Sequence, residues 1–267
     1  MPETQLPQKT AETAGHWIKL PKSRRLVVDL LKYSKKIPSQ PLVRNCNVNE
    51  LVALRKQTSP KVSWPAMFMK AYAIMSTRHP NLRRLFMPWP WAHLHEHPYT
   101  IGRMTVARMH EGEEWVLFYR VVKPETLSLA EMHQQMLEAK NLPVEDVPRF
   151  RLQLLVSNFP TYLRRLAWWY CLNVKGYLRA TIFGTFGMTT VSSLGGISVH
   201  PPSTGATTLT FGPTDPEGNV RVTLCYDHRL LDGAEIARYL RELEEILNGE
   251  IADELRSMAT PELREVA

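Results

Sequence analysis

The segment with the clearest chemical potential is Asp-His-Arg-Leu-Leu-Asp-Gly at 227–233, which follows an alternating, strand-like run at 220–226. A histidine at the end of a strand lies on a short loop, where a neutral imidazole can serve as a general base. Asp232, four residues after His228, can fix that loop through hydrogen bonds or an ion pair, and Gly233 permits a tight or positive-φ turn. An Asp-Gly pair also starts ordinary helices, and a single histidine is often structural, so the segment alone leaves both interpretations open.

This segment closely resembles the C-terminal signature of the dihydrolipoamide acyltransferases of 2-oxo acid dehydrogenase complexes, and chloramphenicol acetyltransferase carries its shorter His-x-x-x-Asp-Gly form. Further segments resemble the same family in the same order along the chain. They are Arg24-Arg25-Leu26-Val27, Ser34-Lys35 with Pro38, the helix-like run 51–56, Gly184-Thr185-Phe186, Val191-Ser192-Ser193-Leu194-Gly195 and His200-Pro201-Pro202. The likeness covers roughly Ser23 to Glu250, and ordered matches are more specific than one short motif.

The resemblance implies a role for four residues. His228 corresponds to the catalytic histidine, Asp232 to the aspartate that orders the catalytic loop, and Ser192 to the hydroxyl that binds the tetrahedral oxyanion. Arg24 corresponds to an arginine that pairs with the loop aspartate. Ser192 could instead be a strand-end hydroxyl and Arg24 a solvated charge at a helix start.

The family also implies the substrates and the assembly. Coenzyme A is the expected acyl carrier, and the acyl group passes directly to a thiol, hydroxyl or amine acceptor in a ternary complex. The expected assembly is a homotrimer in which His228 and Ser192 meet from neighbouring chains. A non-catalytic trimeric scaffold is the alternative, but a scaffold would not need all of His228, Asp232 and Ser192. Peptide-condensation enzymes typically carry a second histidine before the catalytic one, where this chain has Asp227.

The chain also departs from the family. The 22 residues before Ser23 are too few for a lipoyl domain or a peripheral-subunit-binding domain, so we expect a free-standing acyltransferase without covalently bound lipoyl. Residues 151–180 look like an insertion. Within 161–180, apolar positions at helical spacing alternate with four cations, Arg164, Arg165, Lys175 and Arg179.

The insertion has two interpretations. One is a core-packed helix whose arginines face water, which is the commoner use of the pattern. The other is a basic amphipathic helix, rich in tryptophan, that lies on an anionic membrane surface. The charges interrupt the apolar run, which argues against a helix that spans a membrane.

Composition narrows the function classes. The 267 residues are 44% hydrophobic, enough for one large core, and carry a formal net charge of +7. A basic surface suits anionic partners, among which nucleic acid is the least expected because no zinc-finger or RNA-binding string is present. The three cysteines (Cys46, Cys171 and Cys225) are too few and too far apart for a disulfide framework or a metal site. The polar start of the chain has no apolar signal-peptide region, so a cytoplasmic location is expected.

The order of expected elements indicates an α+β fold with a mixed sheet, and the family resemblance implies a chloramphenicol acetyltransferase-like two-layer sandwich. The expected domains are a flexible arm at 1–22, the acyltransferase domain at 23–250 and a tail at 251–267. Helices are expected near 24–37, 49–57, 63–78, 128–140 and 234–247, the last closed by Asn248-Gly249. Strands are expected at 41–48, 101–109, 115–122, 189–193, 207–211 and 220–226.

Overall fold

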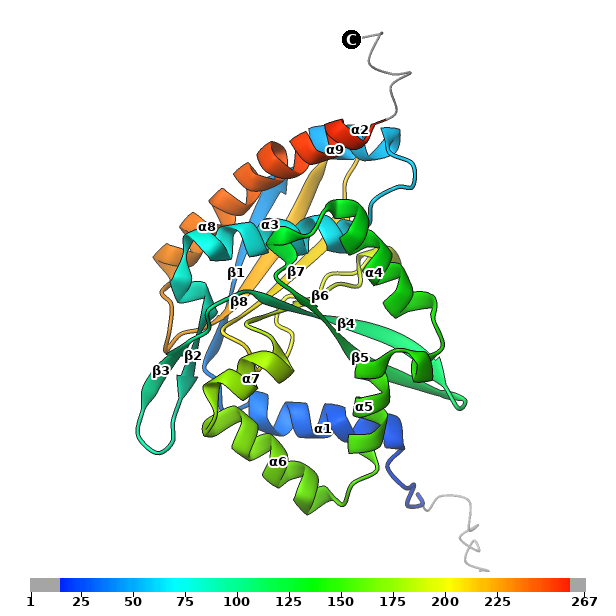
Figure 1. The fold of residues 1–267 in the computed structure, drawn as a ribbon, viewed down its shortest axis with the longest axis vertical. Coiled ribbons are helices and arrows are strands. Elements are labelled where there is room, and N and C mark those ends of the chain that lie inside the picture. The colour runs from blue at the N-terminus through cyan, green and yellow to red at the C-terminus, as the bar shows by residue number, and fades with distance from the viewer. Residues whose placement is uncertain (1–14, 260–267) are drawn as a thin grey trace, which may run out of the picture.

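A computed structural model describes residues 15–259, so residues 1–14 of the expected arm and 260–267 of the expected tail lie outside the described part. A six-stranded mixed sheet organises the fold, in the order β1-β8-β7-β6-β4-β5 (Figure 1). The strands are β1 (Ser39–Asn47), β8 (Asn219–Asp227), β7 (Thr207–Thr214), β6 (Phe186–Thr189), β4 (Ile101–His110) and β5 (Glu113–Val122). β6 is parallel to both its neighbours, and the other pairs are antiparallel. The expected α+β fold with a mixed sheet is confirmed.

The helices and the remaining strands complete the chain. They are α1 (Lys22–Ser34), α2 (Asn49–Gln57), α3 (Trp64–Arg78), α4 (Leu129–Asn141), α5 (Pro148–Ser157), α6 (Thr161–Asn173), α7 (Gly176–Phe183), α8 (Gly233–Ile246) and α9 (Ala252–Met258), with a separate hairpin of β2 (Arg84–Met87) and β3 (His93–Glu96). At the start of α4, the Ser128 hydroxyl accepts from the Glu131 N–H (3.2 Å) and the Glu131 carboxylate accepts from the Ser128 N–H (2.7 Å). These two reciprocal hydrogen bonds form a capping box at the start of α4.

The main hydrophobic core lies between one face of the sheet and α2, α3, α4, α8 and α9. α3 is apolar around most of its circumference, and it lies at the centre of this layer with Phe68 stacked on Phe211 of β7 (ring centroids 4.2 Å apart). A helix that is hydrophobic all round is expected to be buried. The burial fixes the position of α3 under the strands.

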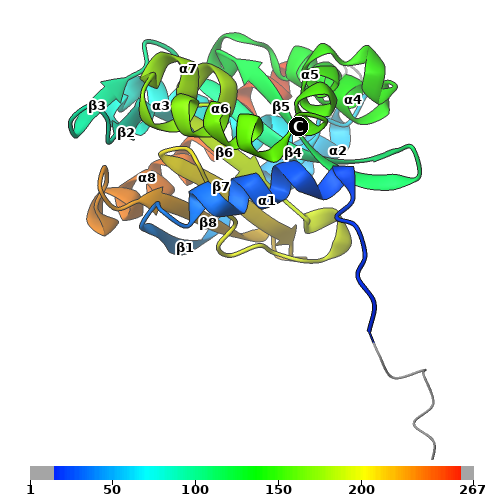
Figure 2. The ribbon, with the colours of Figure 1, turned by 90° about the horizontal axis from the view of Figure 1, so that it is seen from below.

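The opposite face of the sheet is covered at its β4–β5 end by α1, α6 and α7, with α5 beside them (Figure 2). A second apolar cluster joins α1 to α6 and α7, and in it Trp168 stacks on Tyr33 and packs against Phe183. The buried carboxylate of Asp29 on α1 accepts hydrogen bonds from Arg164 and Arg165 of α6. This layer is built largely from α5, α6 and α7, which include the expected insertion at 151–180.

The structure corrects the interpretation of the insertion. Arg164 and Arg179 are both 3% exposed, so these arginines do not face water as expected for a core-packed helix. The apolar stripe faces outward instead: Leu163, Leu166 and Tyr170 are 45%, 61% and 42% exposed. Periodicity located the amphipathic helix but assigned its two faces the wrong way round.

Two element boundaries and one domain boundary also differ from expectation. The strand expected at 189–193 is shifted, because β6 ends at Thr189 and a 3₁₀ turn spans Ser192–Leu194. Asn248-Gly249 does not close α8: the chain continues through a π-helical turn at Leu247–Ile251 into α9, where Leu255 is fully buried. The core therefore extends past the boundary expected at 250. Within residues 15–259, no helix has the length and apolar character to cross a membrane.

Candidate active site

His228 is the first residue after β8, and neighbouring elements hold its backbone. Its N–H donates to the Pro38 carbonyl (3.1 Å), immediately before β1 begins. Asp232 ends the loop as the N-cap residue of α8, where its own N–H donates to Glu235 (3.1 Å). The loop of the 227–233 motif thus connects a central strand to a capped helix.

Gly233 serves this loop by its small size. Its φ is not in the left-handed region, so the positive-φ turn that the sequence allowed is not used. A Cβ at this position would lie 3.3 Å from the Tyr226 hydroxyl, closer than ordinary contact. The glycine therefore leaves room for Tyr226 beneath the His228 loop.

The imidazole of His228 is available for proton transfer. Its side chain is 48% exposed, and its Nδ1 lies 3.6 Å from the Asp232 carboxylate, too long for a hydrogen bond but within ion-pair range. The ring also packs near Tyr226, with centroids 5.4 Å apart. These contacts orient an accessible imidazole.

A buried ion pair anchors the loop from below. The Asp227 carboxylate is fully buried and accepts from the Arg229 guanidinium at 2.9 and 2.6 Å and from the Arg229 N–H at 3.1 Å. The Arg229 guanidinium also lies over the Phe86 ring, 4.3 Å from its centroid. The motif therefore has two halves: Asp227 and Arg229 point into the protein, whereas His228 and Asp232 point outward.

A second arginine extends this network. Arg179 of α7 donates to the carbonyls of Thr204 (2.7 Å) and Phe86 (2.7 Å), and burial lowers its pKa to about 10 although the nearby Asp227 raises it. Sequence reasoning took Arg179 for a surface charge and missed this role. A residue so far from 227 in the sequence carries no local signal of the contact.

Ser192 lies at the other end of the sheet. The Thr190 hydroxyl donates its single proton to the Phe211 carbonyl (3.0 Å) and lies 3.0 Å from Ser192 Oγ, from which it can accept, and Phe211 pairs with Val222 of β8. From Val222 to His228 the chain advances six residues, about 20 Å at ~3.3 Å per strand residue. One chain therefore does not bring Ser192 and His228 together.

Arg24 also lies away from Asp232 within one chain. It is exposed in the first turn of α1, next to Ser23, whose N–H donates to Glu113 at the β4–β5 hairpin (3.1 Å). The end of α1 that leads to the His228 loop is ten residues further on, about 15 Å along a helix. The structure therefore does not form the Arg24–Asp232 pair that the resemblance implied.

Other nucleophiles and metal ligands do not gather at this site. Cys225 precedes His228 by three residues, but its thiol donates to the Val199 carbonyl and burial raises its pKa to about 12. In the described range, no group of three or more His, Cys, Asp or Glu side chains is placed to hold a metal ion. His228 and Asp232 are the exposed reactive groups of the motif.

Comparisons with known proteins agree with this geometry. Residues 207–253, which include β8 and the His228 loop, match the family model described as 2-oxoacid dehydrogenases acyltransferase (catalytic domain). The dihydrolipoamide acetyltransferase of Azotobacter vinelandii superposes with a TM-score of 0.65 at 17% identity, over 94% of this chain and 99% of that one. The chain has the fold of a dihydrolipoamide acyltransferase catalytic domain.

Two further structures share this dihydrolipoamide acyltransferase fold. A probable dihydrolipoamide acetyltransferase from Listeria monocytogenes gives a TM-score of 0.60 at 15% identity, over 87% of this chain and 94% of that one. The truncated catalytic core of a Thermoplasma acidophilum 2-oxoacid dehydrogenase complex gives 0.59 at 17%, over 88% and 99%. No curated protein sequence matches the chain. The resemblance that the sequence suggested is confirmed.

Proposed function

We propose that this protein is an acyltransferase that uses His228 as its general base to move an acyl group between coenzyme A and an acceptor. One observation carries the proposal: an exposed imidazole, flanked by a carboxylate, stands at the strand end inside the segment 207–253 that matches the acyltransferase family. The net charge of +7 suits the phosphates of coenzyme A. We further propose that the reaction takes place in the cytoplasm, without a metal and without covalently bound lipoyl.

The proposed chemistry is a direct transfer in a ternary complex. Nε2 of His228 takes the proton from the acceptor thiol, hydroxyl or amine as that group attacks the thioester carbonyl carbon. The C–S bond then breaks, and the coenzyme A thiolate receives a proton from the imidazolium. Asp232 stabilises the imidazolium electrostatically between these steps.

Ser192 is proposed to donate to the oxyanion of the tetrahedral intermediate. Because the two side chains lie about 20 Å apart along one chain, Ser192 would come from a neighbouring protomer. Of the Azotobacter protein, a serine, a histidine and an asparagine are named in connection with the catalytic mechanism. In that protein the asparagine follows the histidine by four positions, as Asp232 follows His228. A homotrimer with three shared sites is the assembly that we propose, and Arg24 is proposed to reach the loop aspartate only across such an interface.

A transfer assay tests this function. The full chain is incubated with acetyl-CoA and dihydrolipoamide, or with a simple alcohol or amine, and products are separated by mass spectrometry. His228→Ala should reduce transfer by roughly 10²–10⁴-fold, whereas the exposed His16→Ala should retain the wild-type rate. Full activity in His228→Ala contradicts the proposal. Failure of the wild-type chain to bind acetyl-CoA at all would favour the alternative, a non-catalytic trimeric scaffold.

A peripheral membrane contact through 161–180 is a second proposal, supported by the outward face of α6. Tyr162 and Leu166 are 72% and 61% exposed, and Trp169 is 38% exposed beside them. Large exposed apolar groups of this kind mark interaction surfaces. Basic side chains at Arg165 and Lys175 flank the apolar face and would suit anionic lipid.

A further inference from the structure

Two arginines stand directly opposite each other in the sheet, away from the His228 site. Arg103 of β4 and Arg120 of β5 are register partners in the antiparallel β4–β5 pair. Side chains at such positions project from the same face with Cβ atoms about 5 Å apart, and like charges there are destabilising. Strand pairing therefore imposes a repulsive contact that needs a physical reason.

No carboxylate relieves this repulsion. Across residues 15–259, neither Arg103 nor Arg120 forms an ion pair, and no acidic side chain lines the cavity that both contact. A third cation, Arg149 of α5, lines the same cavity and adds to the repulsion at Arg120. Burial lowers the pKa of both Arg103 and Arg120 to about 10. The guanidinium groups of Arg103 and Arg120 thus lack an acidic partner and are also poorly solvated.

Arg103 is held in position by neutral partners only. Its side chain is deeply buried, donates to the Thr204 hydroxyl (3.1 Å) and lies over the Phe118 ring at 4.8 Å. A guanidinium has five N–H donors, so one hydroxyl partner leaves most of its donor capacity unused. Fixed in this way, Arg103 is ready to bind an anion without rearrangement.

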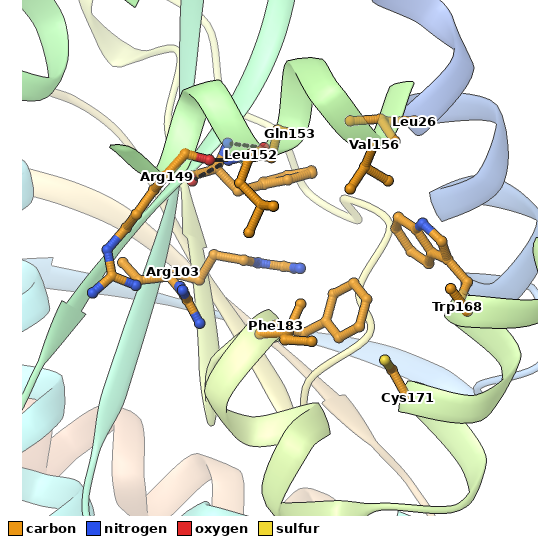
Figure 3. A pocket seen from close by; sticks show the side chains of 13 residues that line it. Leu26, Arg103, Arg149, Leu152, Gln153, Val156, Trp168, Cys171 and Phe183 are labelled. Atoms are coloured by element: carbon orange, nitrogen blue, oxygen red, sulfur yellow. Dashed lines mark hydrogen bonds between the residues drawn. The ribbon is translucent and has the colours of Figure 1, made fainter. Parts of the chain in front are cut away.

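The rest of the cavity is apolar. It has a volume of about 200 Å³ between the sheet and α1, α5, α6 and α7. Arg103 extends into it, with Trp168 and Val156 on the far side and Phe183 beside the guanidinium (Figure 3). An apolar cavity of ~150 Å³ already accepts a benzene ring. The cavity therefore has arginine side chains on one wall and enough apolar space for a small hydrocarbon group.

We propose that this arginine cavity binds a carboxylic acid with a short- or medium-length apolar tail. The carboxylate would lie between Arg103 and Arg120, and the tail would lie against Trp168 and Phe183. Arginine pairs suit planar carboxylates because two parallel N–H bonds can form. β6 and β7 separate β4 from β8 in the sheet, about 14 Å at ~4.8 Å per strand, so this site is distinct from the His228 loop.

Calorimetry with the full chain tests the proposal. Octanoate is the probe, octan-1-ol lacks its charge, and inorganic phosphate lacks its tail. We expect octanoate to bind at least tenfold more tightly than either control. Arg120→Met should weaken octanoate binding by roughly tenfold, since a charge-assisted hydrogen bond is lost. Arg241→Met, at an exposed position of α8, is the matched control and should leave binding unchanged.

The same variant gives an independent readout of stability. Arg120→Met should unfold at a temperature equal to or above that of the wild type without ligand, because it removes an unpaired, repelling charge. Ala167→Leu, which fills the cavity and keeps all three arginines, should also reduce octanoate binding. Wild-type protein that does not bind octanoate would overturn the proposal. The proposal would also be overturned if Arg120→Met bound octanoate as tightly as the wild type, or if octan-1-ol or phosphate bound as tightly as octanoate.

Discussion

The buried Asp227–Arg229 pair should be the main support of the catalytic loop, and Arg229→Met tests this. The change keeps much of the side-chain volume over Phe86 but leaves the Asp227 carboxylate buried without its bidentate partner. Breaking a buried ion pair costs about 3–5 kcal/mol. Arg229 is 30% exposed and Arg179 stays near Asp227, so we expect a smaller loss than that range, about 2–3 kcal/mol.

Denaturant unfolding and steady-state kinetics measure the two consequences. In a chain of this size, the loss corresponds to a melting temperature roughly 4–12 °C lower. Because His228 lies between the two paired residues, kcat for acyl transfer should fall more than the affinity for acetyl-CoA. The double variant Asp227→Asn with Arg229→Met should be less destabilised than the sum of the single variants, since they share one contact. Arg241→Met breaks only an exposed pair with Glu245 and should cost under ~1 kcal/mol. If Arg229→Met is no less stable than Arg241→Met, the pair does not anchor the loop.

Three other perturbations give separate tests. Ser192→Ala should lower kcat roughly 10²–10³-fold with little change in acetyl-CoA affinity, and an unchanged kcat would make the serine structural. Burial lowers the pKa of His97 to about 4, below its usual value, so the unfolded chain binds the extra proton. Stability should therefore fall as pH drops from about 6.5 towards 4. His97→Phe should reduce this dependence of the melting temperature on pH, and a pH profile identical to that of the wild type refutes the prediction. In flotation, the chain should bind anionic but not neutral vesicles. The double variant Leu166→Glu with Trp169→Glu should abolish vesicle binding, and it leaves the buried Trp168 unchanged. If the wild type does not float with anionic vesicles at low salt, the membrane contact is eliminated.

The local part of this site could be predicted from the sequence. β8, the His228 loop and α8 follow one another within about 30 residues, and their alternation, capping residue and helical period are all local signals. Strand pairing is different. The position of Ser192 near the Val222 end of the sheet depends on the strand order β8-β7-β6. No local sequence pattern specifies that order.

The same limit explains the error at α6. Arg164 is buried because it pairs with Asp29, 135 residues earlier in the chain. An amphipathic period shows that a helix has two faces, but only the tertiary partner decides which one is inside. The Arg103–Arg120 pair was likewise not foreseen, since it depends on the register of β4 and β5.

Subunit mixing tests the central claim most directly, that His228 is catalytic and is completed by Ser192 of a neighbouring chain. His228→Ala and Ser192→Ala chains, each nearly inactive alone, are coexpressed with different tags, and mixed trimers are purified. In every purified mixed trimer, whichever variant is present twice, one of the three interfaces combines an intact His228 with an intact Ser192 from the next chain, which is about a third of the sites. We expect purified mixed trimers to recover about a third of wild-type acyl transfer. Activity no higher than that of the two separate variants would contradict it, as would an active monomer in light scattering.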